Sequence, residues 1–319
     1  MIARVPLGVS LAVFVALAAL PWLAGDYWTG QFTRSLLYGL LALSLALVWG
    51  RGGMLCLGQG MFFGTGGYVM ALLTMGKLGP GLADAWLALI VAAASAAALA
   101  AIVGVFVFWG ASISGPYFAI VTLAIAVVLE QLIRSNYGLG GDNGLVGVPP
   151  LPLGTSAFDA TPSYLFVLIV VAAAYFALDA TLSRRIGLVL EALRVNPNRL
   201  AYLGYSLFGW RLATFAAGGA LAGLAGALFV AVDGFASPTL IGFGLSAEAL
   251  IWVALGGRTV LMAALLAAIG VRHGEALLAA SLGDWWLLAL GSVFVLVAVA
   301  APTGLLAAPL LWLGARVRR

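Results

Sequence analysis

The sequence predicts an all-α fold, a polytopic bundle of transmembrane helices. Hydrophobic residues make up 64% of the 319 positions, against roughly 45–50% in an average soluble domain. Charged residues make up only 8%, where about 25% is usual. Apolar stretches of spanning length recur along the whole chain. These observations exclude a soluble enzyme, a disulfide-stabilised secreted protein, a disordered protein and a nucleic-acid binder. They predict a single transmembrane domain over residues 1–319.

A membrane-spanning helix needs about 20 mostly apolar residues, and we expect about ten spans, within a range of roughly eight to ten. The candidates are Leu7–Ala24, Ser35–Trp49, Met54–Met75, Trp86–Trp109, Pro116–Ile133, Tyr164–Leu178, Leu212–Val232, Leu245–Leu255, Thr259–Ala280 and Trp285–Ala301. A signal peptide is the alternative interpretation of the first. The stretch Leu245–Leu255 is short and could be re-entrant, which is tolerated where protein or a water-filled cavity covers the backbone.

The distribution of charge assigns the sides of the membrane. With a cytoplasmic N-terminus, most of the 15 basic residues fall on the inner face, as the positive-inside rule requires. The inner set is Arg4, Arg51, Arg184, Arg185, Arg194, Arg199, Arg211, Arg258, Arg316, Arg318 and Arg319. The outer loops instead collect aspartates. Both termini are therefore predicted to be cytoplasmic.

Two connections are long enough to carry functions of their own. Residues 135–163 form an external loop rich in Gly, Pro, Asn and Asp, which is turn chemistry. This loop could meet an external partner or shape an entrance, and a plain connector is the alternative. Residues 179–211 form a cytoplasmic loop with an apolar stripe from Ile186 to Leu193 that ends before Pro197. Such a stripe fits docking into a groove on another protein, or lying on anionic lipid.

The chain offers few groups for covalent or metal chemistry. It has one cysteine, Cys56, and one histidine, His273, so we expect no metal site. Its only lysine, Lys77, is followed by leucine, which rules out a G-x-x-x-x-G-K-[ST] phosphate loop. We therefore expect a chain that is not an enzyme. If it transports solute with ATP, the nucleotide must bind to another subunit.

Several motifs carry a resemblance to a known family. Residues 187–204 read GLVLEALRVNPNRLAYLG and resemble the cytoplasmic loop of the hydrophobic-amino-acid-type permeases of bacterial ABC importers. The matching positions are Gly187, Leu190, Ala192, Arg194, Asn196, Ala201 and Gly204. Further matches are CLGQGMFFGTGGY from Cys56, GPYFAIVTLA from Gly115, GGDNGLVGVP from Gly140, AGLAGALF from Ala222 and PTGLL from Pro302. The chain departs from the family at Arg258 to Ala263, where larger side chains replace expected glycines.

The resemblance, which runs from about Leu36 to Leu306, is to the M-type permease subunit of branched-chain amino acid importers and their urea or short-chain amide relatives. Details such as Gln59-Gly60 and Asp284-Trp285-Trp286 lean toward the urea branch. It implies a multi-pass protein of the bacterial cytoplasmic (inner) membrane that forms a translocation path with a second permease. It also implies separate ATPase subunits, which carry ATP and Mg, and a periplasmic or extracellular substrate-binding protein. A stand-alone secondary transporter or channel for a small polar solute is the alternative.

The resemblance implies that the inner loop couples the chain to the ATPase, with Leu190, Leu193 and Pro197 filling a groove on that partner. The coupling residues are then Arg184, Arg185, Gly187, Leu190, Glu191, Ala192, Arg194, Asn196, Pro197 and Gly204. Polar groups are costly inside a membrane, which points to a path. The path candidates are Gly58, Gln59, Gly60, Phe62, Phe63, Thr122 and Glu248. The alternative for Gln59 is an interhelical hydrogen bond.

Other residues in the spans have simpler interpretations. Glu130 with Arg134, and Arg272 with Glu275, have the spacing of ion pairs on a helix. An aromatic gate is one interpretation of a further set, and packing is the other: Phe62, Phe63, Tyr68, Tyr117 and Phe118. The pairs Gly60/Gly64 and Gly219/Gly223 predict close helix contacts, within the subunit or at a dimer seam.

Overall fold

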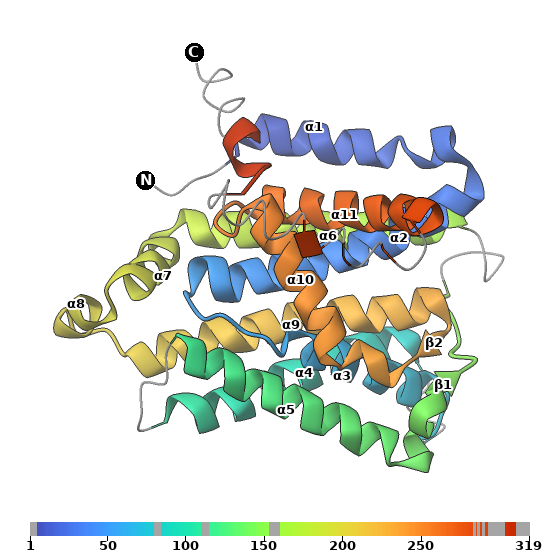
Figure 1. Ribbon diagram of the computed structural model, residues 1–319, viewed down its shortest axis with the longest axis horizontal. Coiled ribbons are helices and arrows are strands. Elements are labelled where there is room, and N and C mark those ends of the chain that lie inside the picture. Colours follow the sequence, from blue (N-terminus) through green and yellow to red (C-terminus); the bar gives the residue numbers. More distant parts are fainter. Residues whose placement is uncertain are drawn as a thin grey trace.

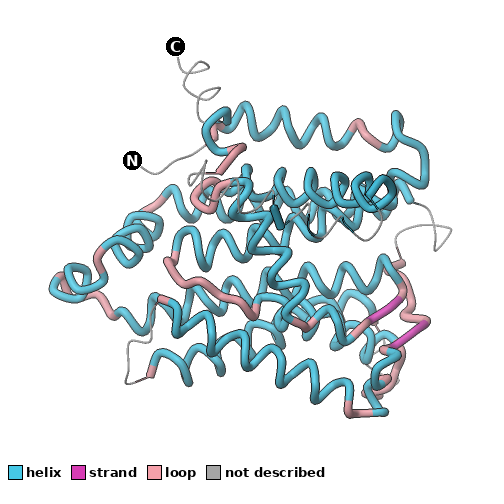
Figure 2. The backbone as a smooth tube through the Cα atoms, in the orientation of Figure 1, coloured by secondary structure: helices cyan, strands magenta, loops and turns pink. Residues whose placement is uncertain are grey.

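The computed structural model describes residues 5–79, 84–109, 115–152, 160–282, 285, 288, 291–292 and 304–310. In this part of the chain the fold is almost entirely helical (Figures 1 and 2). The longer elements are α1 (Leu7–Ala18), α2 (Pro21–Leu45), α3 (Gln59–Thr74), α4 (Ala85–Phe108), α5 (Pro116–Arg134), α6 (Ala160–Ser183), α7 (Arg185–Val195), α9 (Leu207–Asp233), α10 (Phe243–Gly256) and α11 (Leu261–Leu282). The shorter ones are η1 (Ala46–Arg51), η3 (Tyr137–Leu139), η4 (Gly141–Asn143), β1 (Leu145–Val146), α8 (Pro197–Tyr202), β2 (Phe235–Ala236) and η5 (Pro238–Leu240).

Length and composition qualify five helical segments of the described residues as membrane spans. They are Leu20–Arg51, Ala85–Phe108, Pro116–Arg134, Ala160–Ser183 and Leu207–Asp233. The helices Leu7–Ala18 and Phe243–Gly256 are apolar but shorter. The predicted span Trp285–Ala301 falls almost wholly outside the described residues. A helical, membrane-spanning fold is therefore confirmed, whereas the count of about ten spans and the side of each terminus stay predictions.

The prediction of one continuous span over Met54–Met75 is wrong in its first part. After the π-helix η1, residues 53–58 leave the helical path, and α3 begins only at Gln59. The Leu57 N–H, which has no helical partner, donates to Thr122 Oγ1 at 3.2 Å. Non-helical backbone at membrane depth is tolerated where protein covers and pairs it, and Met54, Cys56 and Gly58 of this segment are buried.

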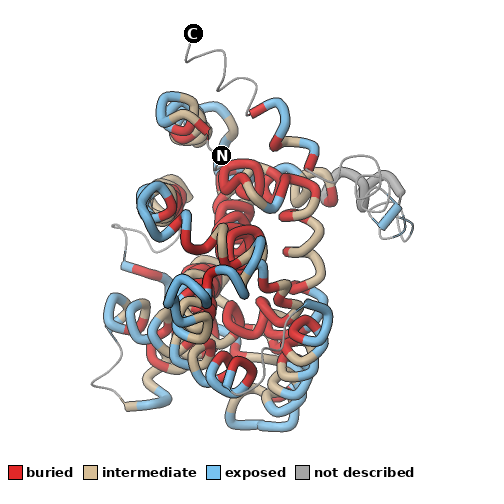
Figure 3. Tube along the Cα trace, turned by 90° about the vertical axis from the view of Figure 1, so that its left-hand side faces the viewer, coloured by how far each residue is buried: buried red, intermediate tan, exposed pale blue. Residues whose placement is uncertain are grey.

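Small residues hold the centre of the bundle together. A methyl group added at Gly66 would overlap the carbonyl of Gly223, so α3 and α9 touch backbone to backbone. The Gly219 and Gly223 positions of α9 also face the buried Ala100 and Ala96 of α4. Figure 3 shows the buried residues concentrated inside the bundle and the exposed ones on its outer helices. The predicted glycine contacts thus lie within the subunit.

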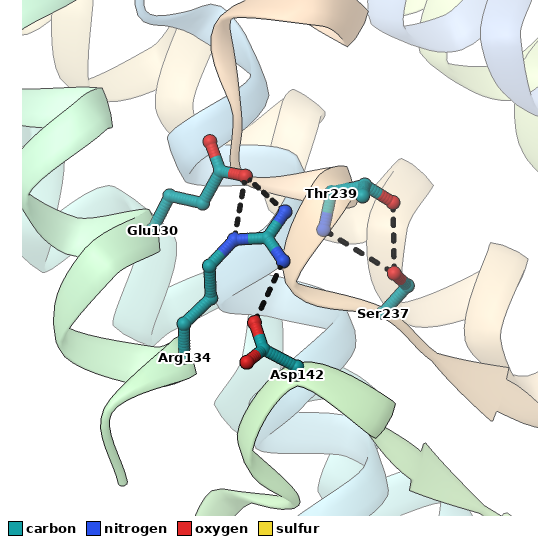
Figure 4. A network of polar contacts seen from close by, with 5 residues as sticks. All are labelled: Glu130, Arg134, Asp142, Ser237 and Thr239. Atoms are coloured by element: carbon teal, nitrogen blue, oxygen red, sulfur yellow. Dashed lines mark hydrogen bonds and ion pairs between the residues drawn. The ribbon is translucent and has the colours of Figure 1, made fainter.

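Residues 135–152 of the predicted external loop lie at one end of the bundle, with β1 and β2 (Figure 1). Strand β1 pairs antiparallel with β2, with Leu145 opposite Ala236 and Val146 opposite Phe235. Arg134 contacts Glu130 through Nη2 at 2.6 Å and Asp142 through Nη1 at 3.0 Å (Figure 4). The predicted Glu130–Arg134 pair is confirmed, and the same arginine fixes the start of the external loop.

Candidate functional site

One group of polar side chains inside the bundle lies at the start of α3. Gln59 is fully buried and its Nε2 donates to Ser44 Oγ on α2 at 2.9 Å. The Ser44 hydroxyl donates in turn to the Leu41 carbonyl at 2.6 Å. The other amide atom, Gln59 Oε1, is buried without a hydrogen-bond partner among the described residues. The predicted interhelical hydrogen bond is therefore present at Nε2, whereas Oε1 remains available to accept a hydrogen bond.

The glycines beside Gln59 let two more helices approach the same point. A methyl group at Gly58 would overlap the Thr122 carbonyl of α5. The Gly60 N–H donates to Ser246 Oγ of α10 at 2.8 Å, and Ser246 is fully buried. Helices α2, α3, α5 and α10 thus meet at the first turn of α3. Four of the seven predicted path residues, Gly58, Gln59, Gly60 and Thr122, therefore lie close together at this point.

Four of the five predicted aromatic residues pack in the core, and the set does not line one opening. Phe62 packs edge-on against Phe215 of α9, with ring centroids 5.3 Å apart. Phe118 packs 5.5 Å from the same ring, and Phe63 lies 5.6 Å from Phe229. Phe62 and Phe63 are fully buried, whereas Tyr117 is 74% exposed. In this conformation these side chains do not form a common gate.

Glu248 lies apart from the Gln59 cluster, in a second polar group between α2, α10 and α11. Arg272 Nη1 lies 2.9 Å from Glu275 Oε2 and 3.6 Å from Glu248 Oε2. The guanidinium carbon also sits 4.6 Å from the ring centroid of Tyr38. The predicted Arg272–Glu275 pair is confirmed. Glu248, with its side chain one-third exposed, is a third member of that group.

The predicted coupling loop forms two short helices, α7 and α8, at the opposite end of the bundle from β1 and β2 (Figure 1). Asn196 caps α8, because its Oδ1 accepts from the Arg199 N–H at 3.0 Å. The expectation that Leu190 and Leu193 fill a groove on a partner is wrong. Both are only 3% exposed, and they pack into the core of this chain. Gly187 makes that packing possible, since a methyl group there would overlap the Leu182 carbonyl of α6.

Other apolar side chains of this loop are exposed instead. Leu188 is 62% exposed and Val195 is 71% exposed, both on α7. Tyr202 and Leu203, at the end of α8, are 91% and 71% exposed. The charged residues Arg184 and Arg185, at the start of α7, are exposed as well. Sequence periodicity found the buried stripe of α7 and missed the exposed residues, because it cannot tell which surface a stripe contacts.

The loop is connected to the Gln59 cluster through the non-helical segment before α3. Gly53 lies against Arg194 so closely that an added methyl group would come within 2.9 Å of Arg194 Cγ. The same residue has a φ of 73°, a conformation that favours glycine. Five residues further on, the segment reaches Gly58 and Gln59. A displacement of α7 therefore bears directly on the backbone that leads into α3.

A family model for the permease component of branched-chain amino acid transport systems matches residues 28–299. The chain belongs to this family. It is 32% identical to the high-affinity branched-chain amino acid transport system permease protein LivM of Escherichia coli (strain K12), an alignment that covers 93% of this chain and 74% of that protein. It is 31% identical to the protein of the same description from Salmonella typhimurium (strain LT2), with the same coverage. None of the solved structures matches the chain.

The family confirms that this permease is a multi-pass, non-catalytic transport component of an ABC system, and the stand-alone alternative is not retained. Within the described residues no group of His, Cys, Asp and Glu could hold a metal ion. At the end of the permease predicted to be external, a hollow of about 400 Å³ lies between α2, α6, α9 and the loop after β1. Asp26, Gln31 and Arg34 line it, and Arg34 Nη2 pairs with Asp233 Oδ1 at 2.6 Å.

Proposed function

We propose that this permease carries branched-chain amino acids across the bacterial cytoplasmic membrane as one of two permease subunits of an importer. The function of its relatives, which are permease proteins of branched-chain amino acid transport systems, supports this substrate class. ATP and Mg bind to separate ATPase subunits at the α7–α8 end, and a substrate-binding protein delivers the solute at the β1–β2 end. These relatives do not support the resemblance of a few residues to the urea branch of the family.

The observation that carries the proposal is the contact between Arg194 and Gly53. It joins the loop that would meet the ATPase to the segment that ends at Gln59. We infer that the ATPase contacts the exposed side chains of α7 and α8 and displaces α7. That movement shifts residues 52–58 and loosens the packing around the first turn of α3.

The same cluster provides suitable chemistry for an amino acid. Gln59 Oε1 is an acceptor for the ammonium group, and the Gly60 N–H, once released from Ser246, is a donor for the carboxylate. A helix that begins inside the membrane also presents its positive end to an anionic group. The buried phenylalanines Phe62 and Phe63 would offer apolar contact to a branched side chain.

Uptake by the assembled importer tests this proposal. The complete complex is reconstituted in proteoliposomes with ATP inside and labelled leucine outside, together with the binding protein. We expect ATP-dependent accumulation that unlabelled isoleucine and valine reduce and urea does not. Accumulation of labelled urea in place of leucine would contradict the substrate class. Accumulation of leucine by this chain alone, without ATPase subunits, would contradict the coupling.

A further inference from the structure

A second hollow, of about 260 Å³, lies where residues 52–54, α7, α8 and the first turns of α5 and α9 meet. Its walls are largely backbone and apolar side chains, among them Met54, Phe118 and Leu193. The charged side chains that line it are Arg194 and Arg211. Among the described residues no carboxylate lines this hollow, so its charged lining is entirely cationic.

Arg211 is the unusual member of this site. It is 8% exposed, and among the described residues it has no hydrogen bond and no ion pair. The nine carboxylates of the described part are elsewhere, and none of them reaches it. Removing a guanidinium from water without an anionic partner is costly. A buried, unpaired arginine that lines an open hollow therefore indicates a missing anion.

Arg194 supplies a second guanidinium with donors to spare. Among the described residues its one ion pair is a 3.8 Å contact from Nη2 to Glu191 Oε1 on the same helix. A neighbouring hollow of about 440 Å³ shares Arg194 and Gly53 and adds Arg258, whose guanidinium carbon lies 5.6 Å from the ring centroid of Trp49. Positive charge thus exceeds negative charge all around this corner of the molecule.

We propose that the hollow binds the phosphate group of an anionic ligand, with Arg211 and Arg194 as its two guanidinium ligands. The planar fork of arginine matches the oxygens of a phosphate. The hollow lies at the starts of α5 and α9, two of the helices long and apolar enough to span a membrane. The ends of such helices lie near the lipid headgroups. Basic pockets between helices on the cytoplasmic side are typical sites for anionic headgroups. The phosphate comes from such a headgroup or from free phosphate.

This site goes beyond the transport function, because it does not depend on which solute is carried. A ligand on Arg194 and Arg211 would bridge α7 to α9 beside the Gly53 contact. Its occupancy would hold the coupling loop against residues 52–54. The permease would then require a lipid or phosphate ligand beside α7, the helix that the proposed coupling moves.

Ligand binding to the purified full chain in an uncharged detergent tests the proposal. Thermal unfolding is followed while phosphatidylglycerol, phosphatidylcholine or inorganic phosphate is added. We expect phosphatidylglycerol to stabilise the wild type in a saturable way and phosphatidylcholine to do so much less. Arg211→Gln should weaken the apparent affinity by about tenfold, which corresponds to one lost charge-assisted contact. Arg199→Gln, which removes an exposed arginine outside the hollow, should leave it unchanged.

Two further variants keep the test decisive. Arg194→Gln removes the more exposed ligand and serves if Arg211→Gln fails to fold, and Arg211→Lys should retain part of the affinity because it keeps the charge. Stabilisation by inorganic phosphate equal to that by phosphatidylglycerol identifies free phosphate as the source and supports the site. Equal binding to the wild type and both glutamine variants overturns it. If none of the ligands binds, the proposal is also overturned, and Arg211 would then pair with a carboxylate of a partner protein.

Discussion

Gln59 is a single residue with one satisfied and one unsatisfied polar atom inside an apolar bundle. Its Nε2 donates to Ser44 Oγ, while Oε1 has no partner in the described part of the chain. A buried acceptor without a donor costs about 1–3 kcal/mol. A purely structural glutamine would not need to carry that cost, whereas an amide that meets a passing solute would.

Replacing this amide separates the two roles. Gln59→Leu removes the acceptor Oε1 together with the donor Nε2 and keeps a similar side-chain volume. We expect leucine uptake by the importer to fall roughly tenfold, the effect of about one lost hydrogen bond to a charged group. Membrane abundance, followed by immunoblot, should fall much less. The matched control is Thr74→Val, which removes a buried hydroxyl that bonds only within α3. Equal losses of uptake and abundance for Gln59→Leu would assign the residue a structural role.

Sequence analysis identified the residues whose chemical type is unusual in an apolar helix. It missed the residues whose importance depends on where the fold places them. Gln59 stood out because an amide is rare in an apolar stretch, and the spacing of Arg272 and Glu275 predicted their pair. Ser44 and Ser246 did not stand out, since serine is unremarkable in such a helix. Their contacts with Gln59 and Gly60 depend on residues 15 and 186 positions apart in the chain.

Among the elements, α3 and α9 depend on their glycines for backbone contact. Gly66→Ala places a methyl group on the Gly223 carbonyl, which cannot move without shifting α9. We expect a loss of about 1–3 kcal/mol in stability, visible as a lower unfolding temperature in detergent. Gly270→Ala in α11 is the matched control, because nothing lies within 4 Å of the added methyl group. Equal unfolding temperatures for the two variants would contradict this packing.

The two leucines of α7 should respond oppositely to a charge. Leu190 is 3% exposed, so Leu190→Glu should reduce the amount of folded chain in the membrane. Leu188 is 62% exposed, so Leu188→Glu should leave abundance unchanged and reduce copurification of the ATPase subunits. Copurification of Leu188→Glu at the wild-type level would exclude this residue from the docking surface.

The sequence predicted elements better than it predicted their contacts. The apolar stripe correctly predicted the helix α7. The stripe packs against the core of the same chain and not against a partner, and the period of a pattern alone cannot distinguish these two surfaces. The break before α3 was not predicted, because residues 54–58 are apolar or glycine and continue the hydrophobic stretch. The glycines at 50, 52, 53 and 58 were the one available signal of an irregular backbone there.

For the whole molecule, the charge distribution predicts that α7 is cytoplasmic and that β1 is external. The only cysteine, Cys56, is fully buried, so single cysteines can be introduced without a background. Val146→Cys and Leu188→Cys replace residues that are 70% and 62% exposed. A membrane-impermeant maleimide should label Val146→Cys in intact cells and Leu188→Cys only after permeabilisation. The reverse pattern would invert the topology and separate the coupling loop from ATP.

The central claim is that movement of α7 reaches the Gln59 cluster through Gly53. The most direct measurement is leucine uptake per ATP hydrolysed by the reconstituted importer with Gly53→Ala, which presses a methyl group on Arg194. Gly76→Ala is the matched control, since Gly76 has a similar φ of 69° but open space around it. We predict that Gly53→Ala lowers the ratio by roughly three- to thirtyfold while Gly76→Ala keeps the wild-type value. A wild-type ratio for Gly53→Ala would contradict the claim.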